Sequence, residues 1–141
     1  MFLKLFSLVV FCVVLIGCGN NNASIDHKED QRERSILEVP VLEIGHEFVY
    51  ISNDSRQCEV GNTPPETTAQ ILIDKGIDVI SSHCGRLTGL AVAAVCGGNT
   101  LEINLHVINS QNTQDAKETG FGIVSELDSE AGVGFQVIEC I

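Results

Sequence analysis

The chain has 141 residues, with 8 Lys or Arg against 19 Asp or Glu, so its formal net charge is −11. That length suits about one domain, and the 44% hydrophobic fraction excludes a wholly disordered chain. The acidic balance argues against a nucleic-acid-binding protein, because such proteins neutralise phosphates with Lys and Arg. No Trp and one Tyr leave little material for an aromatic stacking site.

The first 17 residues have the pattern of a signal peptide. Lys4 precedes an apolar run over residues 5–16, as in the charged and apolar regions of a secretory signal. The run is shorter than the roughly 20 residues of a spanning helix. It ends in a segment that resembles the lipobox of bacterial lipoproteins, Leu15-Ile16-Gly17-Cys18. The alternative is an ordinary signal peptide, or an uncleaved anchor, with a chance cysteine.

The resemblance to a lipoprotein implies a specific maturation. The signal is removed before Cys18, the thiol of Cys18 receives a diacylglycerol, and the new amino group often takes a fatty acid such as palmitate. The mature chain then has 141 − 17 = 124 residues. Each buried CH₂ contributes about 0.8 kcal/mol, and two chains make anchoring stable. In bacteria with two membranes, Gly19 rather than Asp after the cysteine implies the outer membrane.

A polar segment follows the lipobox. Residues 19–34 read GNNNASIDHKEDQRER and hold few apolar side chains, too few to offset the entropy cost of ordering. We therefore expect residues 18–34 to form a lipidated, flexible tether and residues 35–141 to form the folded domain. That domain holds 15 acidic and 4 basic residues. A solvated acidic surface is the simple interpretation, and a site for cations or a basic partner is the alternative.

The first half of the domain predicts a strand, a helix and a second strand. The strand ends in Phe48-Val49-Tyr50-Ile51. Thr63 is expected as the N-cap of a helix with Pro64 at its first position, Glu66 completing a capping box, and Gly76 as the stop. Residues on one face of this helix are Ala69, Leu72 and Ile73, and the next strand covers Ile77–Ile80.

The second half predicts four strands and a short helix. The apolar run 90–95 is typical of a central strand buried on both faces, and the turn 97–99 follows it. Residues 101–107 alternate apolar and polar, which predicts one face on the core and one in water. A helix over Thr113–Thr119, capped by Asn112 and stopped by Gly120, precedes a final strand pair over 121–127 and 133–139.

The expected order is β-α-β-β-β-α-β-β. Antiparallel strands interrupted by two helices indicate an α+β fold with a mainly antiparallel sheet. Because the first helix joins two strands as a crossover, a ferredoxin-like split βαβ sandwich is the specific prediction.

Six cysteines are present, of which Cys12 leaves with the signal and Cys18 carries lipid. The domain keeps Cys58, Cys84, Cys96 and Cys140. An even number in an exported domain predicts two disulfides, and four cysteines allow three connectivities. A right-handed crossover would place Cys58 and Cys84 at one end of the sheet, with Cys96 at the other. The topology therefore favours Cys58–Cys84 and Cys96–Cys140.

The adjacent pair His83-Cys84 is the strongest sign of reactive chemistry, because an imidazole can lower the pKa of a neighbouring thiol. Adjacent residues on a strand point to opposite faces, however, and no C-x-x-C redox motif occurs. A structural disulfide is therefore the favoured interpretation of Cys84.

No metal, cofactor or catalytic constellation is predicted. The four histidines lack i,i+4 helical spacing, and His106 is expected to be exposed on the polar face of its strand. The acidic group Glu126, Asp128 and Glu130 lacks the calcium-loop pattern and indicates a solvated turn.

These patterns favour a lipid-anchored protein of the bacterial cell envelope, periplasmic or at the surface. Its domain is expected to bind an envelope protein or a small ligand rather than to catalyse a reaction. The first alternative is a thiol- or metal-handling protein that uses Cys84 with His83 or His106. The second is a secreted toxin-like or inhibitory factor retained at the surface.

Overall fold

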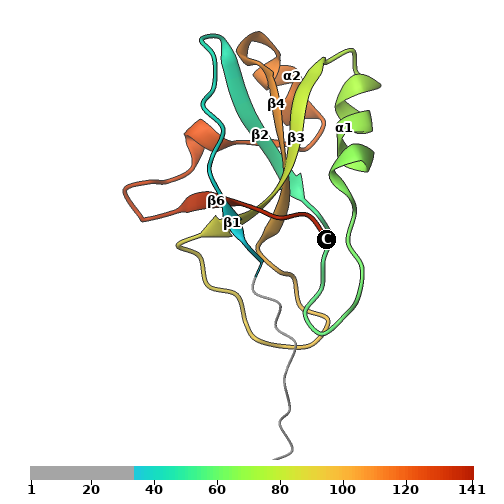
Figure 1. Cartoon of the computed structure of the whole chain (residues 1–141), viewed down its shortest axis with the longest axis vertical. Helices are drawn as coiled ribbons and strands as arrows, with labels where there is room; N and C mark the ends of the chain where they lie inside the picture. The colour runs from blue at the N-terminus through green and yellow to red at the C-terminus, as the bar shows by residue number, and fades with distance from the viewer. Residues whose placement is uncertain (1–33) are drawn as a thin grey trace, which may run out of the picture. The chain divides into compact units, whose positions relative to one another are not determined.

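The computed structural model describes residues 34–141, so the predicted lipobox, and the predicted tether up to residue 33, lie outside the described residues. The described chain is an α+β domain (Figure 1). Its strands are β1 (Ile36–Leu37), β2 (His46–Ser52), β3 (Val79–Thr88), β4 (Glu102–Asn109), β5 (Gly122–Ile123) and β6 (Gly134–Ile138). Its helices are α1 (Pro65–Ile73) and α2 (Thr113–Glu118), with short 3₁₀ turns η1 (Ser110–Asn112) and η2 (Val124–Glu126).

The six strands form one sheet in the order β1-β6-β3-β4-β2-β5, and every neighbouring pair is antiparallel. The predicted α+β class, with a mainly antiparallel sheet and two helices, is therefore confirmed. The prediction that the last two strands pair with each other is wrong. β5 pairs with β2, and β6 pairs with β3. Each added strand therefore forms hydrogen bonds with backbone groups of β2 or β3 that would otherwise be unpaired at the edge of the sheet.

Two apolar clusters lie on opposite faces of the sheet. The cluster beneath the two helices contains Val49, Leu72, Ile77, Ile108, Ala116, Phe121 and Ile123. The cluster on the other face contains Phe48, Ile103, Leu105, Val107 and Val137. Phe48 and Val49 are neighbours in β2 but belong to different clusters, because successive side chains of a strand point to opposite faces.

The strand β4 lies between β2 and β3, and its six residues 103–108 are all buried. The strand itself is predicted correctly from its alternation. The prediction that its polar face lies in water is wrong, because α1 covers that face and leaves Asn104 and His106 with 0% exposure. The alternation identifies the two faces of a strand. Which face is exposed to solvent depends on the elements that pack against each face.

The helix α1 begins at Pro65, one residue later than predicted. Pro64 is the N-cap and no side chain makes a capping hydrogen bond, so the predicted capping box of Thr63 and Glu66 is absent. The Thr63 hydroxyl donates instead to a carboxylate oxygen of Asp54, at 3.4 Å. The helix buries Ala69 and Leu72 but leaves Ile73 exposed, and Gly76 adopts the predicted left-handed conformation after its end (φ +78°).

The run 90–95, predicted as a buried central strand, is an exposed loop. The β3–β4 ladder ends at the pair Arg86 and Glu102, and the last two residues of β3 pair with β6 instead. The chain must then turn back from β3 to β4, and residues 90–95 lie in that connection with no strand beside them. Apolar composition cannot separate a buried strand from an apolar loop when the sheet positions are already filled.

Two disulfides are present, as predicted, but their pairing is Cys58–Cys96 and Cys84–Cys140. The predicted pairing is therefore wrong. Cys96 does not end a strand. It lies in the exposed loop, which folds back beside the loop of Cys58. Cys140 follows β6, whose Ile138 lies opposite Cys84, so the register of β3 and β6 brings Cys140 to Cys84 rather than to Cys96.

We predict that a non-reduced digest of the native protein contains peptides linking Cys58 to Cys96 and Cys84 to Cys140. Replacing either pair by alanines is expected to lower the free energy of unfolding by about 2–4 kcal/mol, because the bridges close long chain segments in the unfolded state. Urea unfolding of Cys58→Ala/Cys96→Ala and Cys84→Ala/Cys140→Ala measures both losses. A peptide that links Cys58 to Cys84 would contradict the assignment.

Candidate functional site

A buried polar network lies between α1 and the sheet. Its centre is His106 in β4, which faces α1 because its neighbours Leu105 and Val107 face the other cluster. The imidazole Nδ1 lies 2.8 Å from the Ser82 hydroxyl of β3, and Nε2 lies 2.8 Å from the Thr68 hydroxyl of α1. The Phe121 ring packs against the imidazole in a T-shaped arrangement, with 5.8 Å between the ring centroids.

One proton arrangement satisfies every hydrogen bond that His106 and Thr68 make. The Thr68 hydroxyl donates to the carbonyl of Pro65 at 3.1 Å and accepts from the Asn104 side-chain amide at 3.1 Å. A hydroxyl has one proton, so Nε2–H of His106 must donate to Thr68. Nδ1 then accepts the proton of Ser82. We therefore assign His106 as neutral, with its proton on Nε2.

Burial, together with the nearby His83, lowers the pKa of His106 to about 4, and Glu66 opposes these two effects. The imidazole is therefore neutral at neutral pH. Serine donating to imidazole is the first contact of a hydrolase triad, but Thr68 occupies the place that a carboxylate takes there. A base with so low a pKa abstracts protons weakly at pH 7. This arrangement holds α1 against β3 and β4.

The network has one incomplete member. The Asn104 amide also donates to the carbonyl of Thr63 at 2.9 Å, which fixes the chain just before α1. Its carbonyl oxygen is the one buried side-chain polar atom in residues 34–141 that finds no hydrogen-bond partner. Such a group costs about 1–3 kcal/mol.

The structure does not gather Cys84, His83 and His106 into one site. The Cys84 sulfur is bonded to Cys140, and Cys84 is buried. His83 points to the opposite face, where its Nε2 lies 3.0 Å from the Ser81 hydroxyl and its ring meets the Phe48 ring. Burial lowers the pKa of His83.

No group of three or more His, Cys, Asp or Glu within the described residues could hold a metal ion. The acidic residues 126–130 lie in a turn. Glu126 pairs with Lys117 at 2.8 Å, and the Asp128 carboxylate accepts the backbone N–H of Ala131 at 3.0 Å. These contacts are local and leave the exposed carboxylates in solvent.

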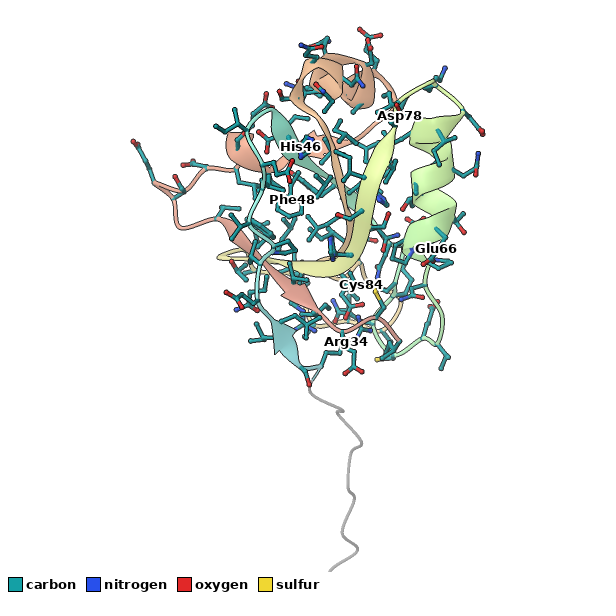
Figure 2. The ribbon with its side chains drawn as sticks, turned by 45° about the horizontal axis from the view of Figure 1, so that its top comes forward. Arg34, His46, Phe48, Glu66, Asp78 and Cys84 are labelled. Atoms are coloured by element: carbon teal, nitrogen blue, oxygen red, sulfur yellow. A yellow bond between two sulfur atoms is a disulfide. The ribbon has the colours of Figure 1, made fainter. Side chains whose placement is uncertain are left out.

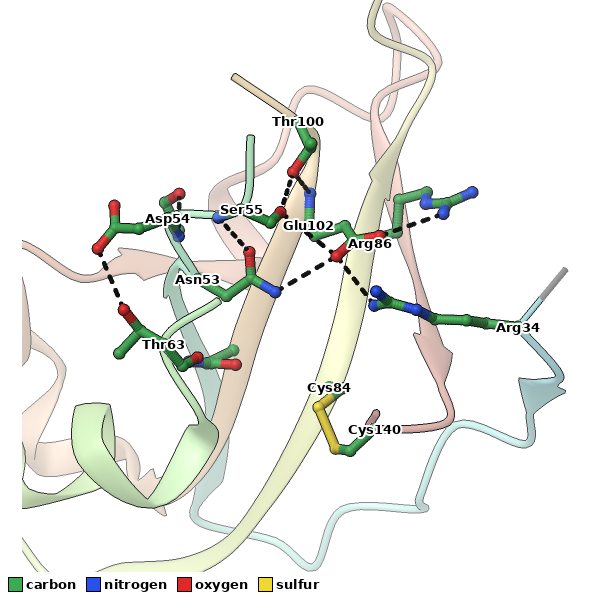
Figure 3. A network of polar contacts seen from close by, with 12 residues as sticks. Arg34, Asn53, Asp54, Ser55, Thr63, Cys84, Arg86, Thr100, Glu102 and Cys140 are labelled. Carbon is green, nitrogen blue, oxygen red and sulfur yellow. Dashed lines mark hydrogen bonds and ion pairs between the residues drawn. A yellow bond between two sulfur atoms is a disulfide. The ribbon is translucent and has the colours of Figure 1, made fainter. Parts of the chain in front are cut away.

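A second polar cluster centres on Glu102, at the start of β4 (Figure 3). Its carboxylate pairs with Arg34 at 2.9 Å and with Arg86 at 3.4 Å. It also accepts hydrogen bonds from Ser55 at 3.3 Å and Asn53 at 3.4 Å. The carboxylate is largely shielded from solvent and joins the first described residue of the domain to the ends of β3 and β4.

Sequence reasoning missed this cluster, because Arg34 and Arg86 are remote from Glu102 in the chain and only the fold places them beside it. The one local signal is the charge at the two ends of an uncharged stretch. Residues 87–101 carry no Asp, Glu, Lys or Arg, while Arg86 and Glu102 bound them. Two oppositely charged residues at the ends of a loop are compatible with an ion pair across its base.

The exposed loop between β3 and β4, residues 89–98, is named here the apolar loop. Leu90, Val92 and Val95 are 44%, 46% and 57% exposed. Gln57 holds the loop from the side: its amide nitrogen donates to the carbonyls of Ala93 (2.8 Å) and Asn99 (3.0 Å), and its amide oxygen accepts the Val95 N–H (3.1 Å). The Cys58–Cys96 disulfide fastens the same two segments.

Comparison with protein-family models, with curated proteins and with solved structures finds no match to this chain. The residues that the structure describes include no helix with the length and hydropathy needed to cross a membrane.

We predict that His106 makes the domain less stable as the pH falls from about 6.5 to 4. The unfolded state takes up a proton in this range while the folded state does not, so unfolding becomes easier by up to roughly 3 kcal/mol. Urea unfolding at pH 7.5, 6 and 5 measures the slope. His106→Gln is expected to flatten it, whereas the control His46→Gln, outside the network, keeps it. An unchanged slope in His106→Gln would contradict the assignment.

Proposed function

We propose that this protein is a lipid-anchored component of the bacterial cell envelope, attached through acyl chains on Cys18. Its folded domain acts by binding rather than by catalysis. The observation that carries the proposal is the combination of a lipobox, Leu15-Ile16-Gly17-Cys18, with a domain whose four cysteines all form disulfides.

The disulfides support export because such bonds persist in oxidising compartments and are rare in the cytosol. They join segments that are 38 and 56 residues apart, so they fasten the domain as a whole. The lipobox-like segment supplies the second half of the argument, since it ends in a cysteine that is not needed for either disulfide. Gly19 favours the outer membrane if the cell has two membranes.

A binding role is supported by how the reactive side chains are used. Cys84 is committed to a disulfide, and both ring nitrogens of His106 are committed to hydroxyls inside the fold. The exposed features are the acidic surface and the apolar loop. These are means of contacting an envelope protein or a small ligand, and the proposal includes no cofactor, metal or nucleic acid.

We also propose that the fold is an extended form of the ferredoxin-like split βαβ sandwich. The order β5-β2-β4-β3 supports this, with α1 joining β2 to β3 across β4 and α2 joining β4 to β5. Residues of both helices belong to one apolar cluster, as expected if both helices cover one face. β6 and β1 then extend the sheet beyond β3.

We predict that mass spectrometry of the protein extracted from membranes gives a chain that starts at Cys18 with added acyl mass. Alkylation before and after reduction is expected to find four thiols, all blocked until reduction. Cys18→Ser is expected to remove the acyl mass and release the protein from membranes. Cys12→Ser is the matched control and should leave both unchanged.

Two outcomes would contradict parts of this proposal. A mature chain that starts elsewhere, or that carries no acyl mass, would contradict the lipoprotein. A Cys84 thiol that is alkylated in the native protein would favour the thiol- or metal-handling alternative.

A further inference from the structure

We propose that the apolar loop rests on the phospholipid surface in which Cys18 is anchored, so that the end of the domain that carries this loop lies against the membrane. This inference rests on the proposed lipid anchor and adds an orientation to it.

The loop exposes apolar side chains that no part of the described chain covers. Leu90, Val92 and Val95 are each about half exposed, and Val60, two residues from Cys58 in the adjoining loop, is fully exposed. The stretch 87–101 carries no charge in a chain with a net charge of −11. Contiguous apolar surface of this kind marks a contact site for a protein or a membrane.

The tether enters the domain at the same end as the loop. Arg34, the first described residue, pairs with Glu102, and Glu102 also pairs with Arg86. Arg86 and Glu102 bound the uncharged stretch 87–101, which contains the apolar loop. Figure 2 shows Arg34 at one end of the molecule, and Figure 1 shows the connection from β3 to β4 at that same end.

The chain length limits how far this end can lie from the lipid. Arg34 is sixteen positions after Cys18, and a fully extended chain over sixteen such steps spans at most about 55 Å. A tether of this length keeps the loop at high local concentration near the membrane, so that weak contacts suffice to hold it there.

The charge distribution favours the same orientation. Of the five basic residues in 34–141, three arginines belong to the loop end: Arg34, Arg56 and Arg86. At that end they are opposed by Asp54, Glu59 and Glu102, by Glu139, whose backbone N–H donates to the Ser35 carbonyl, and by Glu66 in the first turn of α1. The loop end is therefore only weakly acidic.

The opposite end of the sheet, where β2 and β3 begin and β4 finishes, is strongly acidic. It carries Lys75 and Lys117 against a larger acidic set: Glu43, Glu47, Asp74, Asp78, Asp115, Glu118 and Glu126. Anionic phospholipids repel that end more strongly than the weakly acidic loop end, which is left facing the membrane.

The loop is already fixed in shape. Besides the Gln57 side-chain contacts, the Gln57 backbone N–H donates to the carbonyl of Gly98 at 2.9 Å, and its carbonyl accepts the Gly97 N–H at 2.8 Å. These bonds satisfy backbone groups that would be costly to bring toward hydrocarbon. A loop that is held in place loses little conformational entropy on contact, so its apolar side chains can enter the interface between headgroups and acyl chains.

The absence of tryptophan makes a direct test possible. Val92→Trp in the full-length, acylated protein introduces a single reporter in the loop. Ile44→Trp is the control, because Ile44 is fully exposed and its loop contacts the far end of β4 through the Ser110–Gly45 hydrogen bond. Both proteins are reconstituted in phosphatidylethanolamine–phosphatidylglycerol vesicles, with and without brominated acyl chains, and their tryptophan emission is recorded. Leu90→Trp serves as a second loop variant if Val92→Trp does not fold.

The expected result is emission at shorter wavelength for Val92→Trp, with roughly half its intensity lost in brominated vesicles, since interfacial side chains reach about 5–10 Å into the boundary of the acyl region. Ile44→Trp should emit as in water and keep its intensity. Vesicle flotation and intact mass measure the anchor separately. Acylated protein that floats but shows no loop quenching would overturn the orientation and keep the lipoprotein. Protein without acyl mass that does not float would overturn both.

A third outcome distinguishes the other possible occupants. A shift to shorter wavelength without bromine quenching would mean that protein covers the loop. If that shift also grows with protein concentration, the occupant is a second copy of this chain. Either result would overturn the lipid contact.

Discussion

The burial of β4 on both faces is the constraint on which the structure depends. Leu105 and Val107 face one apolar cluster, while the other face of the strand presents Asn104 and His106 to α1. Polar groups at such a position must be paired within the fold. Thr68 and Ser82 supply the partners of His106, so the position of α1 is set by hydrogen bonds as well as by the apolar packing of Leu72.

Local pattern predicts the elements of this fold better than their surroundings. The alternation of β4, the strand at Phe48–Ile51 and the helix that ends before Gly76 could all be found from the sequence, because each depends on neighbouring residues. The burial of His106 and the exposure of Leu90 could not, since both depend on which distant element covers the segment. The disulfide pairing required the register of β3 against β6, and the ion pairs of Glu102 required the fold itself.

The chemistry and the location of the protein thus rest on different parts of the chain. The residues with reactive side chains, Cys84 and His106, are used within the domain to hold strands and a helix together. The features behind the proposed location are the lipobox-like segment, which lies outside the described residues, and the apolar loop at the surface of the domain. The features through which we propose that the domain meets its surroundings lie at its surface, and the interior contacts hold those features in position.

The Cys84–Cys140 disulfide has a mechanical consequence. A pulling force applied to the chain before Arg34 reaches β1, whose two residues Ile36 and Leu37 pair only with β6. Two antiparallel pairs open one after the other under such a load. The next strand inward, β6, is fastened covalently to β3 beside its end, at Cys140. Under such a force β1 is expected to open first, while the disulfide keeps β6 attached to β3 behind it.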